Sequence, residues 1–111
     1  MRKITEVMAT AFLNGQSKKM GNTMVTVDNG ISKMYLHGNL IAIYDFKNSR
    51  DFSISPTDYY TNTTKERLNG ILEVAGHTNK IYQSMGVWYI DIDDKHIFVT
   101  DDWHGYRHIN K

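Results

Sequence analysis

Carboxylate and imidazole side chains gather near the C-terminal end of the sequence. Five of the twelve acidic residues fall between positions 91 and 102, beside His96, His104 and His108. Such side chains are ligands of hard or borderline divalent cations. His104 and His108 are four residues apart and would share one face of a helix. The spacing matches no ligand motif, so a charged hairpin tip and a polar tail are the more ordinary interpretation.

Nucleophilic catalysis has less support in the residue pattern. The sequence has no cysteine, and its serines lie in no G-x-S-x-G or S-x-x-K arrangement. It also lacks the glycine-rich loops that hold nucleotide phosphates. We therefore expect a protein that is not an enzyme and needs no cofactor. A metal-dependent enzyme is the least favoured hypothesis, and its candidate residues are Asp101, Asp102, His104 and His108.

The segment from Tyr59 to Arg67 is suited to an anion. It places hydroxyl groups and two cations at the predicted start of a helix, where free N–H groups and the helix dipole attract negative charge. Two adjacent tyrosines could stack on a base. The second hypothesis is therefore a nucleic-acid- or nucleotide-binding module with the residues Thr61, Thr63, Thr64, Lys65 and Arg67. The alternative is a simple helix cap, because Glu66 would repel anions.

The last nine residues contain the side chains that dominate protein interfaces. Trp103, His104, Tyr106 and Arg107 follow the last predicted strand. The alternative for the aromatic residues is a place in the core, and the sequence leaves both open. Lys18 and Lys19, in a predicted polar loop, form a second candidate surface.

The charge balance limits the class of partner. The 111 residues include 13 Lys and Arg and 12 Asp and Glu, a formal net charge of +1. This excludes an acidic DNA mimic and a strongly basic nucleic-acid binder. Residues 1–50 carry +4 and residues 51–111 carry −3, so nucleic-acid contact would be weak and salt-sensitive. Without cysteines or an apolar stretch of membrane-spanning length, we expect a cytoplasmic protein with no membrane contact.

Periodicity and turn residues predict an α+β fold of one domain over residues 1–111. The predicted elements are a helix at 2–14, strands at 23–27, 31–37, 40–46 and 52–55, a helix from Thr63 to Gly76, and strands at 80–85, 87–92 and 96–100. The order is α-β-β-β-β-α-β-β-β, and the short links favour antiparallel pairing. Turns are predicted at Asn29-Gly30, His37-Gly38, Gly86 and 93–95.

Three local signals make sharper predictions. Thr63 and Glu66 form an S/T-x-x-E capping box at the start of the second helix. Gly70 in the middle of that helix costs about 1 kcal/mol relative to alanine, which a close backbone contact would explain. Strand 40–46 is apolar on both faces, so we expect it to be central and covered on both sides.

Several motifs together resemble a family of small, largely uncharacterised bacteriophage proteins. They are NG at 14–15, GNT at 21–23, LHGNLIA at 36–42, TNTTKERLN at 61–69 and GVWY at 86–89. The similarity extends from about residue 8 to residue 103. It implies a small accessory protein made during infection, in the cytoplasm of the bacterial host. Proteins of this class often bind a host factor, a defence complex or its nucleotide signal.

The first hypothesis combines this resemblance with the residue chemistry. It is a non-enzymatic phage accessory protein that binds and inhibits a host protein, with an antiviral defence component such as a CRISPR effector among the candidates. The low net charge favours a protein partner over nucleic acid. The oligomeric state is left open.

Overall fold

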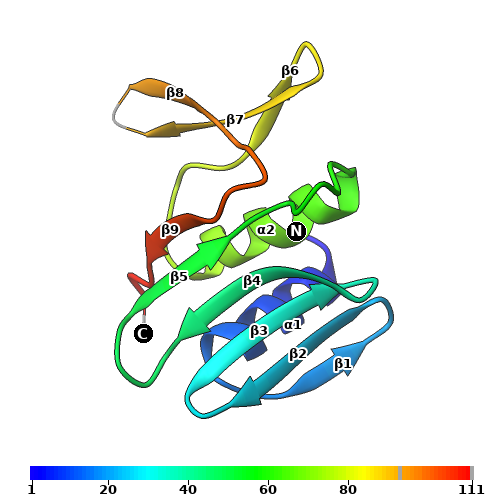
Figure 1. Ribbon diagram of the computed structural model, residues 1–111, viewed down its shortest axis with the longest axis vertical. Coiled ribbons are helices and arrows are strands. Elements are labelled where there is room, and N and C mark those ends of the chain that lie inside the picture. The colour runs from blue at the N-terminus through cyan, green and yellow to red at the C-terminus, as the bar shows by residue number, and fades with distance from the viewer. Residues whose placement is uncertain (93, 111) are drawn as a thin grey trace.

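The computed structural model describes residues 1–92 and 94–110, which form an α+β fold (Figure 1). Its elements are α1 (Lys3–Leu13), β1 (Lys18–Met20), β2 (Thr23–Asp28), β3 (Ile31–Leu36), β4 (Asn39–Asp45), β5 (Asp51–Ile54), α2 (Asn62–Val74), β6 (Tyr82–Ser84), β7 (Val87–Ile92), β8 (Lys95–Phe98) and β9 (His104–Arg107). The predicted class and order are confirmed, with two short strands added, β1 and β9. Asp93, in the last predicted turn, lies outside the described residues.

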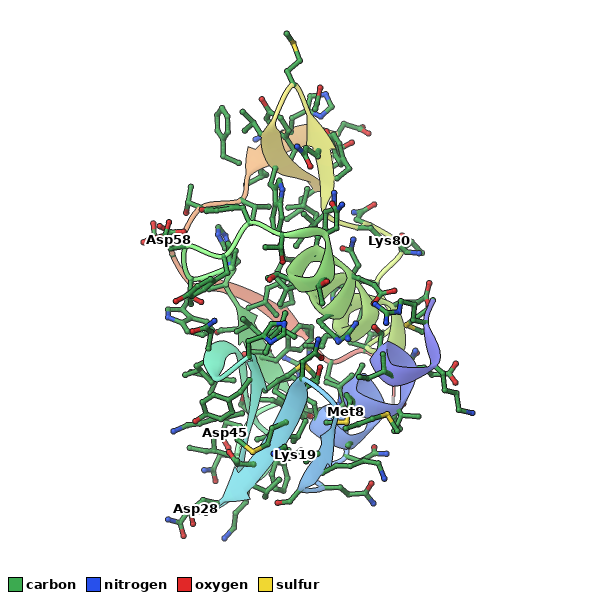
Figure 2. All side chains as sticks on the ribbon, turned by 90° about the vertical axis from the view of Figure 1, so that its right-hand side faces the viewer. Met8, Lys19, Asp28, Asp45, Asp58 and Lys80 are labelled. Carbon is green, nitrogen blue, oxygen red and sulfur yellow. The ribbon has the colours of Figure 1, made fainter. Side chains whose placement is uncertain are left out.

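The strands form two antiparallel sheets. The main sheet has the order β1-β2-β3-β4-β5-β9, and the small sheet has the order β6-β7-β8. Both helices lie against one face of the main sheet (Figure 1). The small sheet stands at one end of the molecule. Asp58 and Lys80 lie near the level where it joins the rest, and Asp28 lies at the far end (Figure 2).

The two predicted hairpin turns in the first half of the chain are confirmed. Asn29 and Gly30 join β2 to β3, with positive φ angles of 51° and 81°. Two successive left-handed residues are typical of the tight turn whose twist matches that of paired strands. His37 and Gly38 join β3 to β4 in the same way.

The start of α2 differs from the prediction. Thr61 is the N-cap, and its Oγ1 accepts a hydrogen bond of 3.1 Å from the backbone N–H of Thr64. The predicted capping box of Thr63 and Glu66 is wrong, because Thr61 already satisfies the helix end and Glu66 instead accepts a hydrogen bond from Thr5 of α1. Neither helix of the described chain is long and apolar enough to cross a membrane.

Gly70 lies where α2 packs closely against α1. A Cβ at this position would lie 2.1 Å from Cγ2 of Thr5. The expected close contact therefore exists, and its partner is a side chain of the neighbouring helix. Thr5 itself is buried, so it has little room to move away.

The core lies between the helices and the main sheet. Its fully buried members include Met8, Phe12, Met34, Ile41, Ala42, Leu68, Ile71 and Leu72. β4 is an interior strand, as predicted, but only one face of the sheet carries helices, so the expectation of cover on both sides is wrong. Ile43 is half-buried on the other face. Ile41 is an extra residue in the register with β3, and this bulge lets it join Ala42 in the core.

The small sheet is anchored by one of its faces. Trp88 and Ile90 of β7 are buried, and the ring of Tyr60 meets Trp88 edge-on at 5.0 Å between centroids. Nζ of Lys65, in the first turns of α2, lies 5.7 Å from the centroid of the Trp88 ring. Because side chains alternate along a strand, the other face of the small sheet points away from the body.

Candidate protein-binding surface

The C-terminal candidate residues divide between core and surface. Trp103 is 42% exposed just before β9, and Arg107 is exposed with Nη1 3.7 Å from Oδ1 of Asp51. Tyr106 is half-buried, and its ring lies 6.0 Å from that of Phe52. Burial raises the pKa of Tyr106. Tyr106 therefore packs at the edge of the core, whereas Trp103 is a surface residue.

The residues from His104 to Arg107 are extended because they form β9. The segment pairs with the free edge of β5, with Tyr106 opposite Phe52. His104 lies opposite Ile54, and its Nε2 is 3.3 Å from the backbone N of Thr100. The sequence pattern gave no separate strand here, because pairing with β5 depends on an edge about 50 residues earlier.

Lys18 and Lys19 lie on β1, so the polar loop predicted there is a strand. Both side chains are exposed. β1 and β9 are the two opposite edge strands of the main sheet. The lysines and the C-terminal residues therefore belong to separate surfaces.

The residues of the metal hypothesis are Asp101, Asp102, His104 and His108. Asp101 Oδ1 accepts hydrogen bonds from Tyr60 Oη (2.6 Å) and the backbone N–H of Asp58 (3.0 Å). His108 is buried with Nδ1 3.1 Å from Tyr44 Oη. The histidines lie on and just after a strand, so the predicted shared helix face is wrong. Among the described residues, no three His, Asp or Glu side chains are placed to hold a metal ion.

Two of these contacts shift proton affinities. Burial and the carboxylate of Asp101 raise the pKa of Tyr60 to about 12. Burial, with a smaller effect of Arg50, lowers the pKa of His108. Both pKa shifts arise from contacts between distant segments. Asp101, between β8 and β9, is bonded to the loop that precedes α2. His108, after β9, is bonded to Tyr44 of β4.

The segment proposed for anion binding does not form a cluster of free donors. Thr61 caps the helix and Thr64 is buried beside it, with 3.0 Å between the two hydroxyl oxygens. Lys65 lies over the ring of Trp88, and Thr63 is half-buried. Arg67 is 1% exposed and points toward α1, so it is not available at the helix end.

Arg67 has a structural position that the sequence analysis missed. Its Nε donates to Thr23 Oγ1 (3.0 Å), and its Nη1 donates to Thr5 Oγ1 (2.7 Å) and to Glu66. Burial lowers the pKa of Arg67, while the neighbouring Glu66 opposes that shift. The guanidinium group thus ties α2 to α1 and β2. Arginine is rarely buried unless paired, and the sequence alone gave no sign of these partners.

The outward face of the small sheet is the second feature that the sequence analysis missed. The register places Tyr82 opposite Tyr89 and Tyr89 opposite Phe98. Ring centroids are 5.8 Å apart for the first pair and 5.1 Å apart for the second. We call these three residues the aromatic ladder. The alternation along 87–92 was visible in the sequence, but the register that aligns the three rings was not.

The small sheet carries exposed apolar side chains on both of its faces. In the described part of this sheet, the exposed large apolar residues are Val87 and Phe98 on the face of the ladder, Met85 in the β6–β7 turn, and Ile92 and Ile97 on the face of Trp88 and Ile90. Phe98 is 58% exposed, and Met85 at the tip of the β6–β7 turn is 99% exposed. Trp103 lies in the segment that leads from the small sheet to β9. The small sheet therefore carries five of the ten exposed large apolar side chains among the described residues, within a segment of 14 residues.

A carboxylate lies beside the aromatic ladder. Asp91 Oδ1 accepts a hydrogen bond of 2.7 Å from Tyr82 Oη and lies 2.6 Å from His96 Nδ1. These contacts lower the pKa of Asp91, and the bond to Asp91 raises the pKa of Tyr82 to about 12. Asp91 is therefore a carboxylate anion at neutral pH, and Tyr82 is a neutral phenol.

Comparison with known proteins identifies a family. The model of the Kyanoviridae Gp96 protein family matches residues 1–109, and the chain therefore belongs to this phage protein family. No curated protein and no solved structure matches the chain. The resemblance to bacteriophage proteins is thus confirmed at the level of a phage family.

Proposed function

We propose that this member of the Kyanoviridae Gp96 protein family is a non-enzymatic accessory protein that binds and inhibits a host protein during infection. Antiviral defence components, such as CRISPR effectors, are among the candidate targets. The contact surface in this proposal is the small sheet, together with Trp103 in the segment that follows it. This moves the centre of the predicted surface from the last nine residues to the three strands before them.

The observation that carries the proposal is the exposed apolar surface of the small sheet. Large apolar side chains exposed together mark interaction sites, whereas single ones are ordinary. Phe98, Val87 and Met85 lie on strands and a turn that the body holds through the opposite face. A sheet that packs on the body through Trp88 and Ile90 and carries apolar side chains on its outer face fits a protein partner.

Charge favours a protein over nucleic acid as the partner of this surface. Between residues 80 and 102 the sequence has five aspartates and two lysines, a formal net charge of −3. Phosphates would be repelled here, since nucleic-acid affinity depends on neutralising them. The alternative site at the start of α2 is weakened by the burial of Arg67.

The proposal that the chain is not an enzyme rests on how polar side chains are used. Asp101 and His108 are engaged in contacts between segments. The cluster of Tyr82, Asp91 and His96 is exposed on a sheet surface, where water is not excluded. Acid–base groups act most strongly in enclosed sites.

An affinity capture from host lysate tests the proposal. The tagged chain is used with and without nuclease, and bound proteins are identified by mass spectrometry. We expect one host protein in stoichiometric amount, retained after nuclease treatment, whose activity falls when the pure chain is added. Recovery that disappears with nuclease would contradict the proposal and favour nucleic-acid binding.

A matched pair of variants locates the surface. Phe98 on the small sheet and Ile109 near the chain end are both 58% exposed. Phe98→Ala should remove most of the capture, and Ile109→Ala should leave it unchanged. Equal capture by both variants would exclude the small sheet as the contact surface. Melting curves of both variants check that the fold is kept.

A further inference from the structure

The aromatic ladder and Asp91 form one continuous patch. Tyr89 and Asp91 are two residues apart on β7, so their side chains emerge on the same face about 7 Å apart. The register places Phe98 next to Tyr89 and His96 next to Asp91. Aromatic faces and a carboxylate are thus presented side by side on an open sheet surface.

One oxygen of Asp91 is left for an outside donor. Oδ1 is close to both Tyr82 Oη and His96 Nδ1, at 2.7 and 2.6 Å. In the described part of the chain, Oδ2 has no hydrogen-bond partner and no cation paired with it. The side chain of Asp91 is 46% exposed, so a ligand can reach it.

The charge around the patch selects the sign of the ligand. The segment 80–102 has a formal net charge of −3, while the rest of the chain has +4. Lys80, one of its two lysines, is paired with Glu73 of α2 at 2.9 Å. The negative face of an aromatic ring attracts cations, and a nearby carboxylate strengthens that attraction.

We infer that the aromatic ladder and Asp91 bind an arginine side chain of the partner protein. The planar guanidinium group stacks on the ring of Tyr89 or Phe98 and donates through its edge to Asp91 Oδ2. Arginine fits better than lysine, because a flat cation stacks on a ring and also presents several donors in one plane. This inference rests on the proposed function, since it specifies the chemistry of the protein that the small sheet contacts.

A peptide titration tests the inference without the natural partner. The ¹⁵N-labelled full chain is titrated with acetyl-Gly-Arg-Gly-amide, and amide shifts are followed by NMR. The same peptide with citrulline keeps the planar shape but removes the charge, and a lysine peptide keeps the charge but removes the plane. We expect shifts confined to β6, β7 and β8, with the arginine peptide bound about fivefold more tightly than the lysine peptide.

Two charge-matched variants separate local recognition from general attraction. Asp91→Asn should weaken arginine-peptide binding about fivefold, and Asp102→Asn, which removes the same charge from an exposed position after β8, should have little effect. Equal effects of the two variants, equal binding of the citrulline peptide, or no shifts on the small sheet would each overturn the inference. Similar shifts with a neutral disaccharide would do so as well, and would indicate a carbohydrate platform.

The same variants distinguish failure of the inference from failure of the proposed function. If the wild-type chain and Asp91→Asn capture the same host protein equally, the inference is wrong and the proposed function stands. If no host protein is captured at all, the proposed function fails, and the peptide titration alone decides whether the patch recognises arginine.

Discussion

Replacing Gly70 by alanine probes the contact between the two helices, and the structure assigns it two opposing effects. Alanine favours a helix interior by about 1 kcal/mol over glycine. The new Cβ would lie 2.1 Å from Cγ2 of Thr5, and relieving such an overlap costs about 1–3 kcal/mol. Because Thr5 is buried and its methyl group is on a short, branched side chain, we expect the overlap to dominate. The net loss of stability should be about 1 kcal/mol.

A second substitution isolates the overlap. Thr5→Ser deletes Cγ2 but keeps Oγ1, which donates to Glu66 at 2.6 Å and accepts from Arg67 at 2.7 Å. The nearest remaining atoms to a Cβ at Gly70 are then Met1 Sδ at 3.3 Å and the Cβ of residue 5 at 3.6 Å. In this background Gly70→Ala should be stabilising by about 1 kcal/mol, which gives a coupling of about 2 kcal/mol between the two sites.

Urea unfolding of the four proteins measures this coupling. Far-UV circular dichroism follows the transition, and an unchanged slope with urea shows that the same surface is exposed in each variant. If Gly70→Ala changes the free energy of unfolding equally in both backgrounds, the reasoning is refuted, because the methyl group of Thr5 would not be what excludes a side chain at position 70.

Three further predictions concern single contacts. Arg67→Met should lower the free energy of unfolding by about 2–4 kcal/mol, because Thr23 and Thr5 would lose a buried hydrogen-bond donor. A loss under about 1 kcal/mol in urea unfolding would contradict this. Thr61→Ala should cost about 1 kcal/mol and Thr63→Ala much less, and the reverse order in the same assay would restore the capping box. In an ultraviolet titration, Asp101→Asn should lower the pKa of the Tyr60 phenol from about 12 toward the ordinary value of about 10. An unchanged titration would show that Asp101 does not raise the pKa of Tyr60. Because this pKa is higher in the folded than in the unfolded chain, its contribution to stability is complete below about pH 10 and is lost as the pH rises through about 12.

The parts of the fold that sequence reasoning predicted are those fixed by nearby residues. The turn at Asn29-Gly30 follows from the left-handed conformation that these two residue types adopt readily. The apolar run of β4 predicts an interior strand for the same local reason. By contrast, β1 has a short sequence with exposed lysines, and its extended form comes from pairing with β2.

The candidate site was harder to predict because it depends on register. Tyr82, Tyr89 and Phe98 lie seven and nine residues apart on consecutive strands, and a shift of one residue in either pairing would place one ring on the opposite face. The burial of Arg67 depends on Thr5 and Thr23, which lie more than 40 residues earlier in the chain. The misplaced helix cap had a local cause, because Thr61 and Thr63 both lie at the start of α2 and only the structure shows which hydroxyl accepts the N–H.

The pairing of β9 with β5 has a consequence for the order of folding. Strands β1 to β5 join by pairing with neighbours in the sequence, which requires the closure of short loops only. β9 must cross about 50 residues to reach β5, and such distant pairings form slowly because chain entropy is lost before any contact is gained. We therefore expect β9 to be the last strand to join. Until it does, the growing or refolding chain presents the open edge of β5, which is the point where aggregation would begin in competition with folding.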